Sequence, residues 1–345
     1  RFFTNMKDKK ILLVGGCGFI GHNLSLDLIK KGCKVYIIDS FGVNNLITLI
    51  DNKDNVPHPE LSKKVLDERV DLIKKTDCNL IVQDARDYHA ISKNIDEINP
   101  DVVIQLAAVS HADRSNKTPY NTFDHSLRTL ENVLDAIKFS KSVQQFIFMS
   151  SSMVYGNFDG KEVDEETNCS PIGIYGALKY SAEKIINAYS QVFDLNYTII
   201  RPSALYGERC ISRRVGQIFI ENALFRKKIS INGLGEEKLD FTYIQDLIQG
   251  ITKSILNEKA YNQIFNITYG NGRRILDLIE ILKNNFNKIE VEFKDRSKLV
   301  PIRGTLSNLK SQELLGYKSE WSLEKGYQKY IDWYKNFFKK NFDAN

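Results

Sequence analysis

The first strand-like segment runs directly into a glycine-rich turn, and this feature constrains the fold more than any other. The apolar run KILLV at residues 10–14 is followed by GGCGFIG, which places Gly15, Gly18 and Gly21 at GxxGxxG spacing before a helical pattern. Glycine lets a turn approach a ligand closely, and the N-terminus of the following helix offers free amides and positive dipole to an anion. The pattern predicts a phosphate-binding turn between a parallel strand and a helix.

The second strand-like segment indicates which phosphate compound binds there. KVYIID ends at Asp39, and the neighbouring Ser40, Phe41 and Gly42 include no arginine. A carboxylate at the end of the second strand accepts hydrogen bonds from adenosine ribose hydroxyls and repels a 2′-phosphate. We therefore expect NAD as the cofactor, and Asp39 as the residue that excludes NADP.

Strands alternate with helical patterns through the first 200 residues. This alternation predicts an α/β fold with a Rossmann-type, doubly wound parallel sheet that binds ligands at the carboxyl ends of its strands. Later segments, such as KISIN and the helical pattern from Leu323 to Trp333, are more mixed. We expect an NAD-binding domain over 6–201 and 238–268, and a smaller mixed α/β substrate-binding lobe over 202–237 and 269–336.

The stretch from Phe41 to Thr76 is less regular. Its charged residues alternate with Leu, Ile and Val at helical spacing, which predicts an amphipathic helix. Two interpretations stay open, an accessory surface insertion and a lid, and the sequence assigns it no role.

Composition excludes several other classes of protein. The 345 residues are 42% hydrophobic and 26% charged, and the net charge of +5 comes from scattered lysines with acids between them. Nothing here requires a nucleic-acid partner, and no apolar stretch reaches the roughly 20 residues of a membrane helix. The five cysteines contain no CxxC pair, so we expect reduced thiols, no metal site and a cytoplasmic protein.

A serine-rich strand end and a YxxxK pair supply the candidate catalytic residues. The strand QQFIFMS leads to Ser151, and Tyr175 and Lys179 follow on one helical face at i and i+4. A nearby ammonium and a nicotinamide cation both favour the phenolate of a tyrosine whose ordinary pKa is about 10. Tyr175 then acts as a general base while the serine hydroxyl bonds the same substrate oxygen.

Together these motifs resemble a known family. ILLVGGCGFIG, VYIID, VIQLAAVSHADRS, FMSSSMVYG, YGALK, IIRPSALYG and GLGEEKLDFTYIQDL are similar to segments of the extended short-chain dehydrogenase/reductases that act on sugar nucleotides. The resemblance covers nearly the whole chain. It implies an NAD-dependent epimerase or dehydratase in which Ser151, Tyr175 and Lys179 are catalytic.

The resemblance also assigns binding residues. Cofactor contacts are implied for Gly15, Gly18, Phe19, Ile20, Gly21, Asp39, Asp84, Ala85, Leu106, Ala107, Ala108, Ser110, Tyr175, Lys179 and Pro202. Substrate contacts are implied for Ser110, Ser152, Met153, Arg209, Arg214 and Arg303.

Departures from the family pattern favour one reaction. Sugar 4,6-dehydratases typically carry acidic residues at the two positions after the catalytic hydroxyl, where this chain has Ser152 and Met153. A thioether can act neither as the acid nor as the base that elimination of water needs. VSHADRS is nevertheless dehydratase-like, so the two segments favour different reactions.

The arginines differ as well. Ala204 stands where relatives have an asparagine, and Leu239 where they have an arginine, so diphosphate contact is expected from Arg209, Arg213, Arg214 or Arg303.

We therefore expect NAD-dependent oxidation at C4 of a nucleotide-diphosphate sugar, foremost as a 4-epimerase of nucleotide-sugar metabolism and polysaccharide biosynthesis. The alternatives are a 4-dehydrogenase that releases a 4-keto sugar, a 4,6-dehydratase and a non-catalytic NAD-binding scaffold. The resemblance further implies a homodimer built on the helices that carry Leu130 to Ala136 and Tyr175 to Tyr189.

Overall fold

A parallel sheet of seven strands forms the centre of the computed structural model, which describes residues 6–51, 53–109 and 112–342. The strand order is β11-β6-β5-β4-β1-β2-β3, and every neighbouring pair is parallel. The order reverses between β1 and β4, where the doubly wound topology predicts a ligand. The strands are β1 (Lys10–Val14), β2 (Lys34–Asp39), β3 (Asn79–Val82), β4 (Val102–Gln105), β5 (Gln145–Met149), β6 (Tyr197–Arg201) and β11 (Gln263–Asn266).

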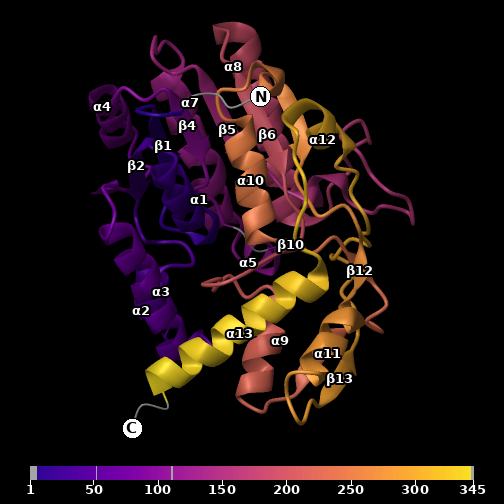
Figure 1. Cartoon of the computed structure of the whole chain (residues 1–345). Helices are drawn as coiled ribbons and strands as arrows, with labels where there is room; N and C mark the ends of the chain where they lie inside the picture. The colour runs from indigo at the N-terminus through magenta and orange to yellow at the C-terminus, as the bar shows by residue number, and fades with distance from the viewer. Residues whose placement is uncertain (1–5, 52, 110–111, 343–345) are drawn as a thin grey trace.

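Helices cover both faces of this sheet because the side chains of each buried strand alternate between them. Ile11 and Leu13 of β1 belong to a core cluster with helices α1, α3 and α10, whereas Leu12 and Val14 pack in a second cluster with α4, α7 and α8. The predicted Rossmann-type α/β fold is confirmed (Figure 1). These helices are α1 (Phe19–Lys30), α3 (Pro59–Lys74), α4 (Tyr88–Ile98), α7 (Thr129–Ile137), α8 (Gly173–Phe193) and α10 (Ile244–Ser254).

A smaller group of elements lies at the carboxyl ends of the strands. It contains β8 (Ile229–Asn232) paired in parallel with β13 (Val291–Lys294), together with α9 (Val215–Leu224) and α11 (Ile275–Lys283). In Figure 1 the long helix α13 (Leu323–Phe342) runs diagonally across the front of the molecule, from the strand ends toward α3. Short pairs join β7 (Leu205–Tyr206) to β10 (Thr242–Tyr243), and β9 (Lys238–Leu239) to β12 (Arg273–Arg274).

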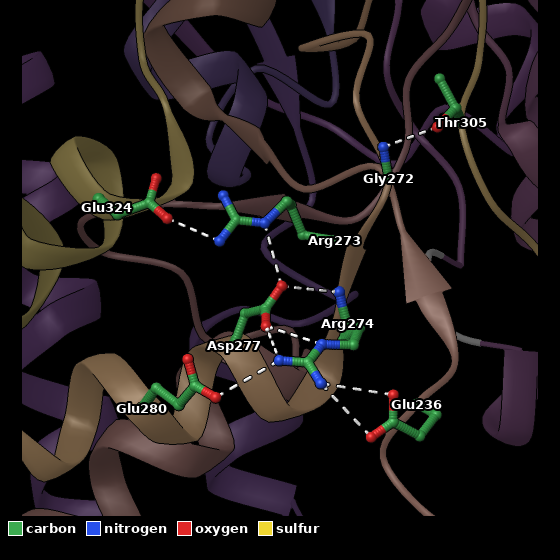
Figure 2. A network of polar contacts seen from close by, with 8 residues as sticks. All are labelled: Glu236, Gly272, Arg273, Arg274, Asp277, Glu280, Thr305 and Glu324. Atoms are coloured by element: carbon green, nitrogen blue, oxygen red, sulfur yellow. Dashed lines mark hydrogen bonds and ion pairs between the residues drawn. The ribbon is translucent and has the colours of Figure 1, made fainter.

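The start of α11 is fixed by two arginines. Figure 2 shows Arg273 and Arg274 of β12 converging on Asp277, which also accepts the backbone N–H of Arg274 at 3.0 Å. Arg273 reaches Glu324 of α13 at 2.6 Å. The network therefore ties α11 and α13 to the strand pair β9 and β12.

The Phe41 to Thr76 stretch contains the long helix α3 and two short elements, and the remaining elements of the chain are short. That stretch forms α2 (Leu46–Asp51), a 3-10 turn (Lys53–Asn55) and α3, whose one face buries Leu61, Val65, Arg69 and Ile73. The others are α5 (Ala112–Lys117), α6 (Pro119–Phe123), a π-helical turn (Asp124–Arg128), 3-10 turns at Ser152–Tyr155 and Glu258–Ala260, and α12 (Leu309–Leu315). Among the described residues no helix is long and apolar enough to cross a membrane.

Candidate active site

A cavity of about 120 Å³ lies at the carboxyl ends of β1, β2 and β4. Its wall contains eleven of the residues expected to bind the cofactor, including the three glycines and Asp39. They are Gly15, Gly18, Phe19, Ile20, Gly21, Asp39, Asp84, Ala85, Leu106, Ala107 and Ala108. Ser110, expected to bind both cofactor and substrate, lies outside the described residues.

Glycine is required at the turn for steric reasons. Gly15 has a φ of +84°, which favours glycine, and a Cβ there would lie 2.6 Å from the backbone N of Ala107. A Cβ on Gly21 would lie 2.5 Å from the Cα of Gly16, so the first turn of α1 could not pack against the glycine turn that follows β1. Gly18 is the N-cap residue of α1, so the free N–H groups of that helix lie at the wall of the cavity.

Asp39 is oriented by the turn that it faces. Its Oδ2 accepts the N–H of Cys17 at 2.8 Å, and its Oδ1 accepts the N–H of Phe41 at 2.7 Å. Burial raises the pKa of this carboxyl, and the two N–H groups oppose that rise. Each oxygen keeps a lone pair for a ribose hydroxyl. The glycine turn, the N-terminus of α1 and Asp39 together fit a dinucleotide.

A second cavity, of about 300 Å³, adjoins the first. Ile20, Leu106, Ala108 and Arg214 line both. The second cavity brings together the three predicted catalytic residues and further predicted contacts, namely Ser151, Tyr175, Lys179, Met153, Pro202, Arg213, Arg214 and Arg303.

Lys179 is buried, and its Nζ donates to the carbonyl of Met149 at the end of β5, 2.7 Å away. The ammonium lies 5.9 Å from the centre of the Tyr175 ring. Burial lowers the pKa of Lys179 to about 8, with Glu183 opposing and Arg214 adding to the fall. The Lys179 ammonium, which loses its proton about one pH unit above neutral, therefore lies beside the phenol of Tyr175, the predicted general base.

Of the two serines at the start of the 3-10 turn, Ser151 and Ser152, one lies at the cavity and the other in the core. Ser151 lines the cavity, and its Oγ accepts the N–H of Met153 at 3.1 Å as the cap of the 3-10 turn. Ser152, expected to contact substrate, is not among the lining residues, and its Oγ is buried without a hydrogen-bond partner. The side chain that follows it into the cavity wall is Met153.

A buried polar network behind Lys179 was not expected from the sequence. Glu183, one turn further along α8, forms an ion pair with Arg201, whose Nη2 lies 2.6 Å from Oε2. Ser150 donates to Glu183 at 2.5 Å, and Arg201 also donates to the hydroxyl of Tyr155 at 3.0 Å. The network locks the end of β5 to α8, so Ser151 and Tyr175 stay aligned. A glutamate four residues after Lys179 was the signal available in the sequence.

Arginines contribute most of the positive charge in the second cavity. The Nε atoms of Arg214 and Arg303 are buried without hydrogen-bond partners, and neither residue has an ion pair within the described part of the chain. Burial and the charge of Arg214 lower the pKa of Arg303 to about 10. Two unpaired guanidinium groups in one cavity fit a ligand with several negative charges.

The structure does not bring Arg209 to this cavity. Its Nε donates to Nε2 of His22 at 3.0 Å. Another arginine, Arg69 of α3, lines the first cavity, and it was not predicted from the sequence. Arg69 lies four residues from both Val65 and Ile73, on the apolar face of α3. This spacing was the signal in the sequence that Arg69 is buried.

A glycine turn and an acidic strand end in one cavity, with a Ser, Tyr, Lys set in the cavity that adjoins it, define an NAD-dependent oxidoreductase of the short-chain type. The model of the NAD dependent epimerase/dehydratase family matches residues 11–268, so the chain belongs to this family of enzymes.

Similar proteins agree with this assignment. The "uncharacterized UDP-glucose epimerase YtcB" of Bacillus subtilis is 29% identical over 321 residues, which cover 92% of this chain and 95% of that protein. The dTDP-D-glucose 4,6-dehydratase of Bos taurus is 25% identical over 344 residues, covering 96% and 90%.

Among solved structures, the UDP-glucuronic acid 4-epimerase from Bacillus cereus, in complex with UDP-glucuronic acid and NAD, superposes with a TM-score of 0.85. It is 27% identical, and the match covers 95% of this chain and 99% of that one. The UDP-glucose 4-epimerase of Thermotoga maritima, with UDP-glucose, gives a TM-score of 0.81 at 25% identity, covering 95% and 99%.

Proposed function

We propose that this enzyme is a 4-epimerase of UDP sugars. The observation that carries the proposal is the wall of the second cavity, where Met153 stands beside Ser151 and Tyr175. Elimination of water would need an acid and a base here, but a thioether supplies neither. Inversion at C4 needs only proton and hydride transfer at one carbon, for which the set Ser151, Tyr175 and Lys179 suffices.

Each side chain then has a defined task. When bound, NAD supplies a hydride acceptor and donor for C4 of the sugar. Tyr175 removes the proton of the C4 hydroxyl and later returns a proton to the same oxygen, and the hydroxyl of Ser151 bonds that oxygen in both directions. Lys179 favours the phenolate through its charge.

The unpaired guanidinium groups support a nucleoside diphosphate as the carrier of the sugar. Arg214 and Arg303 interact electrostatically with each other, Arg214 also with Lys179, and Arg303 also with Tyr175. The diphosphate therefore binds close to the catalytic residues. UDP is the nucleotide of the two solved epimerases reported above.

We also propose that the enzyme is a homodimer joined through α7 and α8, and that it works in the cytoplasm. Leu178, Ile185 and Tyr189 of α8 are only partly buried, so this helix presents an apolar strip to a partner. All five cysteines lie in the described chain and are free, which suits a reducing compartment. Light scattering that gave the mass of a monomer at micromolar concentration would refute the dimer.

The test of the proposed reaction is a product analysis on a panel of UDP, GDP, CDP and dTDP sugars, with Tyr175→Phe as the inactive control. We expect a UDP hexose or hexuronic acid to give a product of unchanged mass and inverted C4 stereochemistry. A product lighter by two hydrogens would show a dehydrogenase, one lighter by water a dehydratase, and either would overturn the proposal.

A further inference from the structure

Arg69 is a buried cation far from the catalytic residues in sequence, on the helix α3 to which the sequence assigned no role. It is 2% exposed and lines the cofactor cavity together with Asp39. Burial lowers its pKa to about 10, and no ion pair to a carboxylate is found for it among the described residues. A buried guanidinium without a carboxylate partner destabilises the fold. The hydrogen bonds of Arg69 therefore indicate which part of the structure it holds in place.

Both hydrogen bonds found for Arg69 go to the backbone of Arg209. Its Nε donates to the carbonyl of that residue at 2.8 Å, and its Nη2 donates to the same oxygen. Arg209 has a φ of +65°, in the left-handed region that a non-glycine residue adopts at a cost. Arg69 therefore stabilises an unfavourable turn in the loop between β7 and α9.

The side chain of Arg209 continues the connection to the glycine turn. It donates to Nε2 of His22, and Nδ1 of His22 bonds the carbonyl of Gly18 at 2.9 Å. Because Nε2 is an acceptor, the proton must be on Nδ1. Burial holds the pKa of His22 well below its usual range, so the ring stays neutral and this tautomer persists.

The loop fixed in this way forms part of both cavities. Ser212 lines the first cavity, which fits the dinucleotide, and Arg213 lines the second cavity, which holds the catalytic residues. Arg214 lines both. Helix α3 is also anchored to the end of α9, since the ring of His58, the residue before α3, stacks on Phe225, the residue after α9, with centroids 3.7 Å apart. One chain of hydrogen bonds therefore runs from α3 through the loop to the turn that faces the dinucleotide.

We propose that Arg69 is a positioning residue for cofactor retention, which acts through Arg209 and His22 to hold the loop at 207–214 against the glycine turn. The need for retention rests on the proposed function, because an epimerase has to return the hydrogen it removes to the same sugar. The contacts themselves do not depend on it, and retention can be measured without any sugar.

The test compares the full-length enzyme with Arg69→Met, which keeps the aliphatic length but removes the donors. Lys63→Met is the matched control, because Lys63 is exposed on the same helix. Each protein is loaded with etheno-NAD as a fluorescent probe, and its dissociation rate is measured by displacement with excess NAD. We expect Arg69→Met to release the probe at least about tenfold faster, and Lys63→Met to match the parent protein.

A second variant covers the case in which Arg69→Met does not fold. Arg209→Gly suits the positive φ and removes the guanidinium contacts of this residue, namely the bond to His22 and the ion pair with Glu68 of α3, so it should fold and also release the probe faster. Unchanged dissociation from either folded variant would overturn the proposal. A role in folding alone would lower the unfolding temperature and the fraction of active protein, but would not change the release rate of the folded fraction.

Discussion

Lys179→Met should make the protein more stable at neutral pH while it destroys the activity. Burial lowers the pKa of Lys179 from 10.5 to about 8. At about 1.4 kcal/mol per pH unit, this difference means that the buried ammonium destabilises the fold by about 3 kcal/mol at pH 7. Methionine removes that cost but leaves the Met149 carbonyl without its donor, which costs about 1–3 kcal/mol. The net gain should therefore be between about 0 and 2 kcal/mol.

The pH dependence provides the sharper test. The folded protein releases the Lys179 proton near pH 8, whereas the unfolded chain keeps it up to 10.5. Between these values the unfolded state binds more protons, so the stability of the parent protein rises with pH. No such rise occurs in Lys179→Met.

The assay is denaturant unfolding of both proteins without cofactor, from pH 7 to pH 10.5. We expect the free energy of unfolding of the variant, relative to the parent, to fall by about 3 kcal/mol over this range. Effects of other titrating groups cancel in the difference between the two proteins. A difference that stayed constant with pH would refute the claim that Lys179 is held as a costly buried ammonium.

Four further variants test the catalytic residues and the buried network behind them. Tyr175→Phe should lower turnover by about 100- to 10,000-fold while NAD binding, measured by calorimetry, stays nearly intact; unchanged turnover would exclude Tyr175 as the base. Ser151→Ala should reduce kcat far more than Ser152→Ala, since only Ser151 lines the cavity; the reverse order would mean that the wrong hydroxyl was assigned. Glu183→Gln should destabilise the fold by about 3–5 kcal/mol, because its arginine partner stays buried and unpaired. It should also move the alkaline loss of kcat to lower pH, because the carboxylate raises the pKa of Lys179, and an unmoved alkaline limb would contradict this coupling.

Most of the cofactor cavity could be predicted from local sequence. The glycine turn and Asp39 act within one strand-turn-helix-strand unit, so their spacing already determines where they lie. The segments KILLV and KVYIID match β1 and β2 residue for residue. The Tyr175 and Lys179 pair is likewise local, since both residues lie on one face of α8.

The parts that could not be predicted depend on long-range packing. Glu183 meets Arg201 only because α8 lies against β6, and Arg69 meets Arg209 although 140 residues separate them. Arg209 was expected among the substrate contacts, but its left-handed backbone directs its side chain to His22. Ser152 was expected in the cavity, but the 3-10 turn after Ser151 buries it and places Met153 in the wall.

The central claim, that this site inverts C4 and does nothing else to the sugar, is tested most directly by following the hydrogen on that carbon. A UDP hexose or hexuronic acid deuterated at C4 would be incubated with the enzyme, and the product analysed by NMR and mass spectrometry. We expect the C4 epimer with deuterium still at C4 and no loss of water. Deuterium at C6 of a product lighter by water, or deuterium missing from a 4-keto sugar, would contradict the account.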